Sequence, residues 1–383
     1  MRTHSTVRFM SDSVPQYIQS KLQQRQSENN FRLLTLKQGL VDFTSNDYLG
    51  LSRNAELHKA VLEEVKNLPL GSTGSRLLSG NSSYVEELEK YFAELHQSED
   101  ALLFNSGFDA NYGLLSTLPY RGHTIIYDEL VHASMHDGIK ASKATGIPFK
   151  HNNVADLEAK LQQAEGLKYV VVESLYSMDG DYSPLKEIAA LCEKYNTALI
   201  VDEAHATGIL GSHGTGRILS EGLQSQCLVR IHTFGKAIGG NGAVVLCSSE
   251  LKSFLVNYCR PFIFSTALPF YNLAHIKCAY QWLQTSEAVA ATEKLFALVR
   301  LFRSRLTNTH VELLPGETPV QSVVVTGNDE VRKFATAIQH AGFDVRPILS
   351  PTVRRGRERI RICIHSFNSE AEVIKLAETI NKL

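Results

Sequence analysis

Two stretches decide the fold: Ala198-Leu199-Ile200-Val201-Asp202-Glu203-Ala204-His205 and Val229-Arg230-Ile231-His232-Thr233-Phe234-Gly235-Lys236. Each joins a short apolar run, typical of a buried strand, to polar residues at its end. Similar runs alternate with helical patterns at 101–104, 124–127, 169–172 and 243–246. Strands that alternate with helices predict an α/β fold with a mostly parallel sheet covered on both faces.

The polar residues after these strands predict a cofactor site, because ligands bind such sheets at the carboxyl ends of the strands. A lysine amine bonds to the aldehyde of pyridoxal 5'-phosphate, and a carboxylate beside the pyridine nitrogen keeps that nitrogen protonated. We therefore predict pyridoxal 5'-phosphate as the cofactor, with Lys236 and Asp202 as its partners. Taken alone, Lys236 could equally be a solvated loop lysine, and Asp202 a helix cap.

A phosphate site is predicted where the run 101–104 ends and a helix begins. There the amides of Ser106, Gly107 and Phe108 would face a phosphate at the positive end of the helix dipole. Thr233 would add a hydroxyl group. His132 offers an aromatic face for the pyridine ring, although a lone histidine is more often structural.

The pattern changes after Pro269, where a helical stretch from about Tyr271 to Leu306 is predicted to carry the chain out of the large domain. Strands at 321–325 and 360–364 and helices at 330–340 and 370–383 then predict a smaller α+β domain. We expect an N-terminal arm over 1–45, a large cofactor-binding domain over 46–270, and the linking helix with the small domain over 271–383.

Composition limits the classes of protein to consider. The chain has 383 residues, a formal net charge of -1 and 43% hydrophobic residues, without the long apolar run of a membrane span. It offers no overall positive field for nucleic acid, since its basic run at 354–361 is short. The six cysteines lack a C-x-x-C pair, and residues 1–17 lack an apolar signal-peptide core. We expect a cytoplasmic protein with reduced thiols, and no metal, membrane or nucleic-acid partner.

Five motifs spread along the chain carry a resemblance to a known family. They are TSNDYLGL (44–51), GSTGSRLLSG (71–80), ESLYSMDGD (173–181), DEAH (202–205) and TFGK (233–236). With them the chain resembles the α-oxoamine synthases, which are fold-type I pyridoxal-phosphate enzymes, over nearly its whole length. The resemblance implies a transferase whose large, mostly parallel domain is followed by a smaller C-terminal one.

The resemblance also implies roles for single residues. Lys236 would bond the cofactor and act as acid and base at the substrate α-carbon, while Asp202 would face the pyridine nitrogen. His205 would lie near the ring hydroxyl, His132 would stack on the ring, and Ser177 would support the same site.

Substrate and partner contacts follow from the same resemblance. Arg361 corresponds to the family's carboxylate-binding arginine, with Asn46 as its helper. The segment 264–269 resembles one that sends a threonine, here Thr266, into the phosphate site of a second subunit. We therefore expect a homodimer with shared active sites.

The substrates are expected from the branch of the family. The form of residues 71–80 is most similar to the branch that condenses L-alanine with a pimeloyl thioester in biotin biosynthesis. Glycine C-acetyltransferase is the alternative branch, and the carrier is left open between coenzyme A and acyl carrier protein. Two departures from the family pattern, Arg354 and Ser366-Phe367-Asn368, lie on the expected acyl side and leave the acyl chain open.

Two other classes compete with these predictions. The residues 202–205 also spell the metal-binding box of DEAH-type nucleic-acid ATPases. Such an ATPase needs G-x-x-x-x-G-K-[ST], whereas Gly235-Lys236 is followed by Ala237 and lacks the upstream glycine. A cofactor-free binding protein on the same fold would have little reason to keep Lys236.

Overall fold

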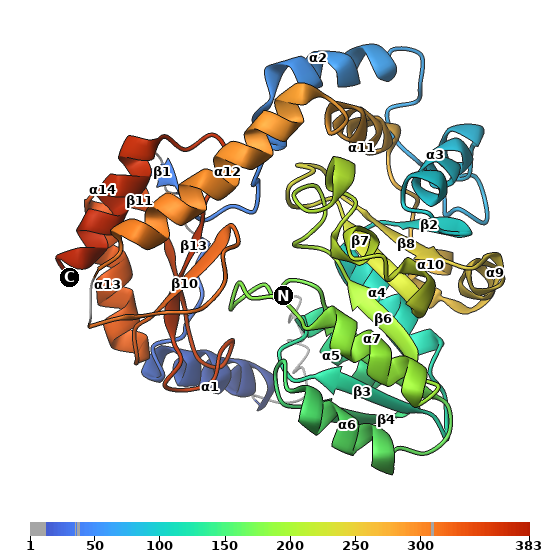
Figure 1. Ribbon diagram of the computed structural model, residues 1–383, viewed down its shortest axis with the longest axis horizontal. Coiled ribbons are helices and arrows are strands. Elements are labelled where there is room, and N and C mark those ends of the chain that lie inside the picture. The colour runs from blue at the N-terminus through green and yellow to red at the C-terminus, as the bar shows by residue number, and fades with distance from the viewer. Residues whose placement is uncertain (1–12, 35, 37–38, 308–309) are drawn as a thin grey trace, which may run out of the picture.

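The structure is a computed structural model that describes residues 13–34, 36, 39–307 and 310–383. Its centre is a seven-stranded sheet (Figure 1). The strands are β2 (Asp100–Phe104), β3 (Thr124–Asp128), β4 (Thr145–Phe149), β5 (Lys168–Glu173), β6 (Ala198–Asp202), β7 (Cys227–Thr233) and β8 (Ala243–Cys247). They lie in the order β2-β8-β7-β6-β5-β3-β4, and only β8 runs antiparallel to its two neighbours. The prediction of an α/β fold with a mostly parallel sheet is confirmed.

Helices cover both faces of this sheet, as the apolar strands require. Along β2, Leu102 packs into one core cluster and Leu103 into another, because successive side chains of a strand point to opposite faces. The covering helices are α3 (Ser83–Leu95), α4 (Gly107–Thr117), α5 (Ala133–Ala141), α6 (Val154–Gln163), α7 (Leu185–Lys194), α8 (Arg217–Ser220), α9 (Ser249–Tyr258) and α10 (Arg260–Phe264). The helices α4 and α5 follow β2 and β3 directly, so they begin at the carboxyl edge of the sheet.

The helical stretch predicted from Tyr271 to Leu306 is two helices, α11 (Phe270–Trp282) and α12 (Ser286–Arg305), so the prediction of one long helix was wrong. The break comes at Thr285, whose side chain accepts a hydrogen bond from the backbone N–H of Ala288 and caps α12. Figure 1 shows α12 crossing from the large sheet to the C-terminal part.

The C-terminal part is a small antiparallel sheet flanked by helices. Its strands are β9 (Glu312–Leu313), β10 (Val320–Val324), β12 (Arg346–Ile348) and β13 (Arg359–Cys363), in the order β12-β13-β10-β9. The helices are α13 (Asn328–His340) and α14 (Glu370–Asn381), and α14 packs on α12. A smaller α+β unit is therefore present, while the predicted limits at residues 45 and 270 stay a prediction.

The N-terminal segment lies against this C-terminal part, with α1 (Ser13–Ser27) beneath it in Figure 1. The short strand β1 (Val41–Asp42) pairs in parallel with β11 (Phe343–Asp344). The chain then passes a 3-10 turn at Leu51–Arg53 and enters α2 (Ala55–Glu64), which packs on α11. Residues 43–50 therefore lie between the two parts of the molecule, where Asn46 was predicted to act.

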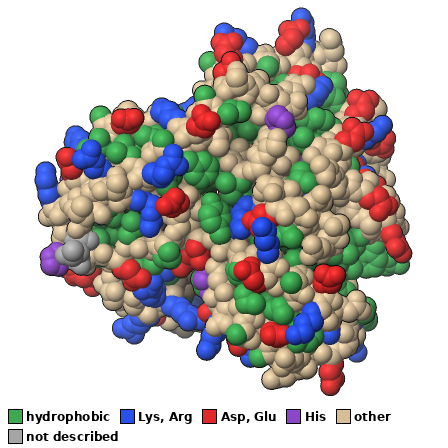
Figure 2. Space-filling view, viewed as in Figure 1, with side chains coloured by type: hydrophobic (Ala, Val, Ile, Leu, Met, Phe, Trp, Pro, Cys, Tyr) green, Lys and Arg blue, Asp and Glu red, His purple; other side chains and the backbone are tan. Residues whose placement is uncertain are grey.

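The charges on the surface are consistent with the composition of the chain. Basic and acidic side chains are interspersed over the face shown in Figure 2, as the near-zero net charge requires. None of the helices in the described ranges is both long and apolar enough to span a membrane. All six cysteines are free, and all but Cys227 are buried.

Candidate active site

The predicted site lies at the carboxyl edge of the large sheet. Glu173 and Asp202 are the last residues of β5 and β6 and stand side by side in register. Lys236 follows the last residue of β7 by three positions, in a loop closed by hydrogen bonds from the Phe234 N–H to Gly242 O (2.9 Å) and from the Gly239 N–H to Lys236 O (2.8 Å). The parallel strands thus bring the predicted amine and carboxylates together.

The amine of Lys236 is available for chemistry. It has no hydrogen-bond or salt-bridge partner within the described part of the chain. Burial lowers its pKa and outweighs the charges of Asp202 and Glu173, which raise it, while Arg361 lowers it further. A lysine with a lowered pKa has more neutral amine at neutral pH, which is the form that attacks an aldehyde.

Asp202 is fixed in place by two hydrogen bonds. One carboxylate oxygen accepts from the Ala204 N–H at 2.7 Å, and the other accepts from the side-chain amide of Asn111 at 2.7 Å. Asn111 comes from α4, so the helix that begins at the phosphate site also holds this carboxylate. These two donors fix the orientation of the carboxylate that is predicted to face the pyridine nitrogen.

The two predicted histidines take different roles in the structure. His132 caps α5, because its Nδ1 accepts a hydrogen bond from the Ser134 N–H (3.2 Å). His205 is buried, and its Nδ1 lies 2.7 Å from the Tyr48 hydroxyl. Burial lowers the pKa of both histidines, and the charge of Lys236 lowers each further. Both are therefore neutral, with His132 free to offer its ring face.

The start of α4 forms the predicted phosphate cradle, the space bordered by Ser106, Gly107, Phe108 and Thr233. Ser106 uses its hydroxyl to cap the helix, accepting from the Asp109 N–H at 3.0 Å, which leaves the amides of Gly107 and Phe108 in the first turn without helical partners. A Cβ atom on Gly107 would lie 3.0 Å from Thr233 Oγ1, so only glycine leaves the space between them open. The side chain of Phe108 is exposed and stacks on the ring of Tyr112, so only its backbone amide is offered to a phosphate.

Arg361, the predicted carboxylate-binding residue, has a donor that no other described residue uses. An amine of the Arg361 guanidinium donates to Asn46 Oδ1 at 2.7 Å, while Arg361 Nε is buried without a partner in the described residues. The charge of Arg361 acts on both Lys236 and His205, which places all three in one site. Arg359, two residues earlier, is already bonded to Asp179 at 2.7 Å. Arg361 is thus the arginine with donors to spare.

Two predicted residues are not tied to this cluster. Ser177 is buried, yet no hydrogen bond in the described ranges joins it to any of the other site residues. The side chain of Thr266 is exposed, and its carbonyl accepts from the side-chain amide of Asn105 (2.7 Å), next to the phosphate cradle. Their roles stay predictions.

Three site residues were missed by the sequence analysis, although signals for them existed. Glu173 ends a strand beside Asp202; its carboxyl is buried with one oxygen unpartnered, and burial and the Asp202 charge raise its pKa. Tyr48 stands within the motif 44–51 and bonds His205. Asn111 lies one helical turn after Gly107, so helix periodicity alone would have placed it on the same side.

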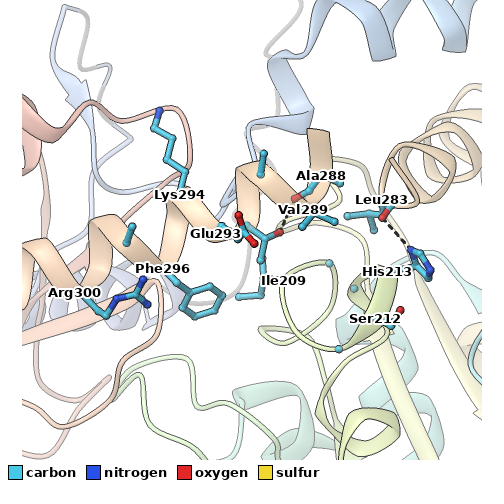
Figure 3. Close-up of a pocket in the computed structure, with 16 residues that line it drawn as sticks. Ile209, Ser212, His213, Leu283, Ala288, Val289, Glu293, Lys294, Phe296 and Arg300 are labelled. Atoms are coloured by element: carbon cyan, nitrogen blue, oxygen red, sulfur yellow. Dashed lines mark hydrogen bonds between the residues drawn. The ribbon is translucent and has the colours of Figure 1, made fainter. Parts of the chain in front are cut away.

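A hollow of considerable volume lies elsewhere, away from the site residues. Its volume is about 870 Å³, and it runs between the loop Gly208–Gly214 and α12, as Figure 3 shows with His213, Glu293 and Arg300 on its walls. None of the site residues named above lines it. The pocket and the cluster of titratable residues are therefore at different places. We assign the active site to the carboxyl edge of the sheet, because the amine and the carboxylates that the chemistry needs are there. The described residues contain no group of three or more His, Cys, Asp or Glu that could hold a metal ion.

Comparison with known proteins identifies the family of the chain. Residues 38–380 match the family model of class I and II aminotransferases, and the chain belongs to this family. It is 40% identical over 372 residues to the 8-amino-7-oxononanoate synthase of Emericella nidulans, covering 91% of this chain and 90% of that one. It is also 36% identical to the aminoacyl transferase sphA of Byssochlamys spectabilis (93% and 83% covered). A structure of serine palmitoyltransferase with pyridoxal phosphate superimposes on this chain with a TM-score of 0.88 at 25% identity. The match covers 97% of this chain and 98% of that one.

The resemblance to α-oxoamine synthases is therefore confirmed, as are the fold-type I fold and the cofactor pyridoxal 5'-phosphate. The residues fit this group: an unpaired amine at Lys236, a fixed carboxylate at Asp202, and a cradle at Gly107 that a Cβ would fill. The protein is an enzyme of this family and not the nucleic-acid ATPase that the residues 202–205 also allow.

Proposed function

We propose that the protein condenses L-alanine with a pimeloyl thioester, releasing carbon dioxide and the thiol, to give 8-amino-7-oxononanoate for biotin biosynthesis. The relatives named 8-amino-7-oxononanoate synthase support this, since several are 35–40% identical over most of the chain. The observation that carries the substrate class is the buried, unpartnered Nε of Arg361, which suits an amino-acid carboxylate.

The residues divide the work of this reaction. When bound, pyridoxal phosphate supplies an electron sink for the electrons left at the amino acid α-carbon. Asp202 would hold the proton on its pyridine nitrogen, and Lys236 would take the α-proton as a neutral amine. Arg361 would hold the substrate carboxylate. A carbon–carbon bond then forms between the α-carbon and the acyl carbon, with the thiol as leaving group.

Substrate choice is tested with a panel. We expect carbon dioxide release to be fastest with L-alanine and pimeloyl thioester, among alanine, glycine and serine crossed with pimeloyl, acetyl and palmitoyl thioesters on coenzyme A and on acyl carrier protein. Serine belongs in the panel because serine palmitoyltransferase is among the similar structures. Faster turnover with glycine and acetyl-CoA, or with serine and palmitoyl-CoA, would reject the proposed substrates and retain the reaction class.

Arg361→Lys is expected to raise the KM for alanine by roughly 10- to 100-fold, since a lysine supplies charge without the two-pronged fork, and a charged hydrogen bond is worth about 1.5–3 kcal/mol. Arg357→Lys is the matched control, because Arg357 pairs with the exposed Glu312 at 2.6 Å. Steady-state kinetics with varied alanine make the measurement. An unchanged KM in Arg361→Lys would move the carboxylate site to another residue.

We also propose a homodimer that works in the cytoplasm, where its free thiols stay reduced. Large exposed apolar side chains support a partner surface beside the phosphate cradle, at Leu70, Leu78 and Phe264. Their two segments touch each other, since the Ala267 N–H donates to Gly74 O at 3.0 Å. A second copy of the chain would cover them.

Mixed dimers test whether the site is shared. If Thr266 serves the partner's site, a hybrid of a Lys236→Ala protomer and a Thr266→Ala protomer contains one site free of both lesions. We therefore expect mixing to raise activity above that of either parent, measured after denaturation and refolding together. A Ser265→Ala protomer replaces Thr266→Ala in the control mixture. Activity that stays at the average of the two parents would place Thr266 in its own chain's site.

A further inference from the structure

His151, in the turn between β4 and α6, lies between two carboxylates: Asp128 at the end of β3 and Asp181 in the turn that follows β5. Its Nδ1 is 2.9 Å from Asp128 Oδ1, and its Nε2 is 2.9 Å from Asp181 Oδ2. A neutral imidazole has one N–H, so two carboxylate contacts call for the doubly protonated ring. Burial alone would lower the pKa of His151, but the bonds and charges of both aspartates raise it to about 10. His151 is therefore positively charged at neutral pH.

The surroundings of His151 hold this arrangement tightly. Asp128 is fully buried and also accepts from the backbone N–H groups of Leu130 and Asn152, each at 2.9 Å. The side chain of Asn152 donates to Asp181 Oδ2 at 2.9 Å. The ring of Tyr176 packs edge-on against His151, with centroids 4.5 Å apart. Removing the imidazolium would leave a buried carboxylate without its cation, which is destabilising.

His151 with Asp128 and Asp181 forms a bridge, and residues next to each aspartate are bonded to the C-terminal part of the chain. Next to Asp128, Glu129 forms an ion pair with Arg354. Near Asp181, in the same turn, Asp179 pairs with Arg359 at 2.7 Å, and the carbonyl of Met178 also accepts from Arg359 at 3.2 Å. The segment that carries Arg361 is therefore attached at two points, and His151 joins the two attachment loops to each other.

The same loops carry the site. His132 follows Glu129 by three residues, and Arg361 follows Arg359 by two positions on the same side of β13. We propose that His151 is a positioning residue that fixes the placement of the Arg361 strand relative to His132, and so aligns the amino acid carboxylate for reaction. This inference rests on the proposed function, because it takes Arg361 as the carboxylate site.

The first test is kinetic. His151→Ala is expected to raise the KM for the amino acid on the order of tenfold with a smaller change in kcat, because a displaced carboxylate site weakens binding before chemistry. Combining it with Arg361→Lys is expected to add less than the two separate effects, since both act on one contact. His123→Ala, at the opposite end of β3, is the matched control. His151→Gln keeps hydrogen-bond donors without charge and serves if the alanine variant folds poorly.

The second test needs no turnover. In the protein without cofactor, we expect hydrogen exchange in peptides covering 176–182 and 353–361 to be faster in His151→Ala than in wild type, and unchanged in β8. Unchanged exchange, or a lower melting temperature with KM and kcat both at wild-type values, would overturn the positioning role. A wild-type enzyme inactive with every amino acid in the panel would instead reject the proposed function, while the exchange result still decides the bridge.

Discussion

Lys236→Ala is expected to leave a folded protein that binds pyridoxal phosphate without any borohydride-reducible link and with activity lower by at least about 10³-fold. The variant lacks the amine proposed as the covalent partner of the cofactor, and a general base is itself worth roughly 10²–10⁴-fold. Folding should survive because the Lys236 amine has no partner to lose in the described structure. Peptide mass mapping after borohydride reduction and a carbon dioxide assay make the two measurements.

The control is another partly buried lysine on the same protein. Lys277 pairs with Glu64 at 2.6 Å, far along the chain from the site, so Lys277→Ala should keep both the link and the activity. A reduced adduct on Lys252 or Lys277 in the wild-type protein would show that the site assignment is wrong.

Asp202→Asn is expected to fold and bind the cofactor but to lose turnover by about 10²–10³-fold, the usual effect of removing one electrostatic partner of the transition state. The new amide still accepts from the Ala204 N–H. Asn111 can rotate its side-chain amide, since its own oxygen is buried and unpartnered, and accept a hydrogen bond in turn. Shape is kept while charge is lost. Cofactor titration by absorbance and single-turnover kinetics separate binding from chemistry.

The neighbouring carboxylate gives the contrast. Glu203 accepts from the backbone N–H groups of Arg217 and Ile218 and from the Ser174 hydroxyl, so its bonds hold structure. Glu203→Gln should lower the melting temperature with a small effect on the turnover of the folded fraction. Near-normal turnover in Asp202→Asn would remove Asp202 from the mechanism.

The central sheet was predictable because buried parallel strands have a local sequence signature. Asp202 and Lys236 could be predicted to lie near each other because the carboxyl ends of parallel strands share one edge of the sheet. β4 was missed for a physical reason: Gly146 and Pro148 argue against a strand, yet an edge strand that pairs only with β3 tolerates a proline. The break at Thr285 was hidden because the apolar pattern continues through Leu283.

Side-chain partners that come from distant segments had no local signature at all. Asn111 reaches Asp202 from 91 residues away, and Tyr48 reaches His205 from 157 residues away. Motif resemblance linked Arg361 with Asn46; the structure joins them by a 2.7 Å hydrogen bond, and their roles at the substrate stay predictions. The resemblance could not indicate that Asn368 would be buried, accepting from the His365 N–H and donating to the carbonyl of Asp42.

The pairing of β1 with β11 determines the order in which parts of the nascent chain can fold. The Thr44 hydroxyl donates to the carbonyl of Asp344, 300 residues later, so β1 has no partner until β11 has been synthesised. At roughly 5–20 residues per second, that wait is about 15–60 s on the ribosome. The large sheet can assemble meanwhile, whereas the segment that carries Asn46 and Tyr48 cannot adopt its final position until β1 has paired with β11. Catalytic competence is therefore expected to appear only after β11 and the strand β13 that follows it have been synthesised and have left the ribosome.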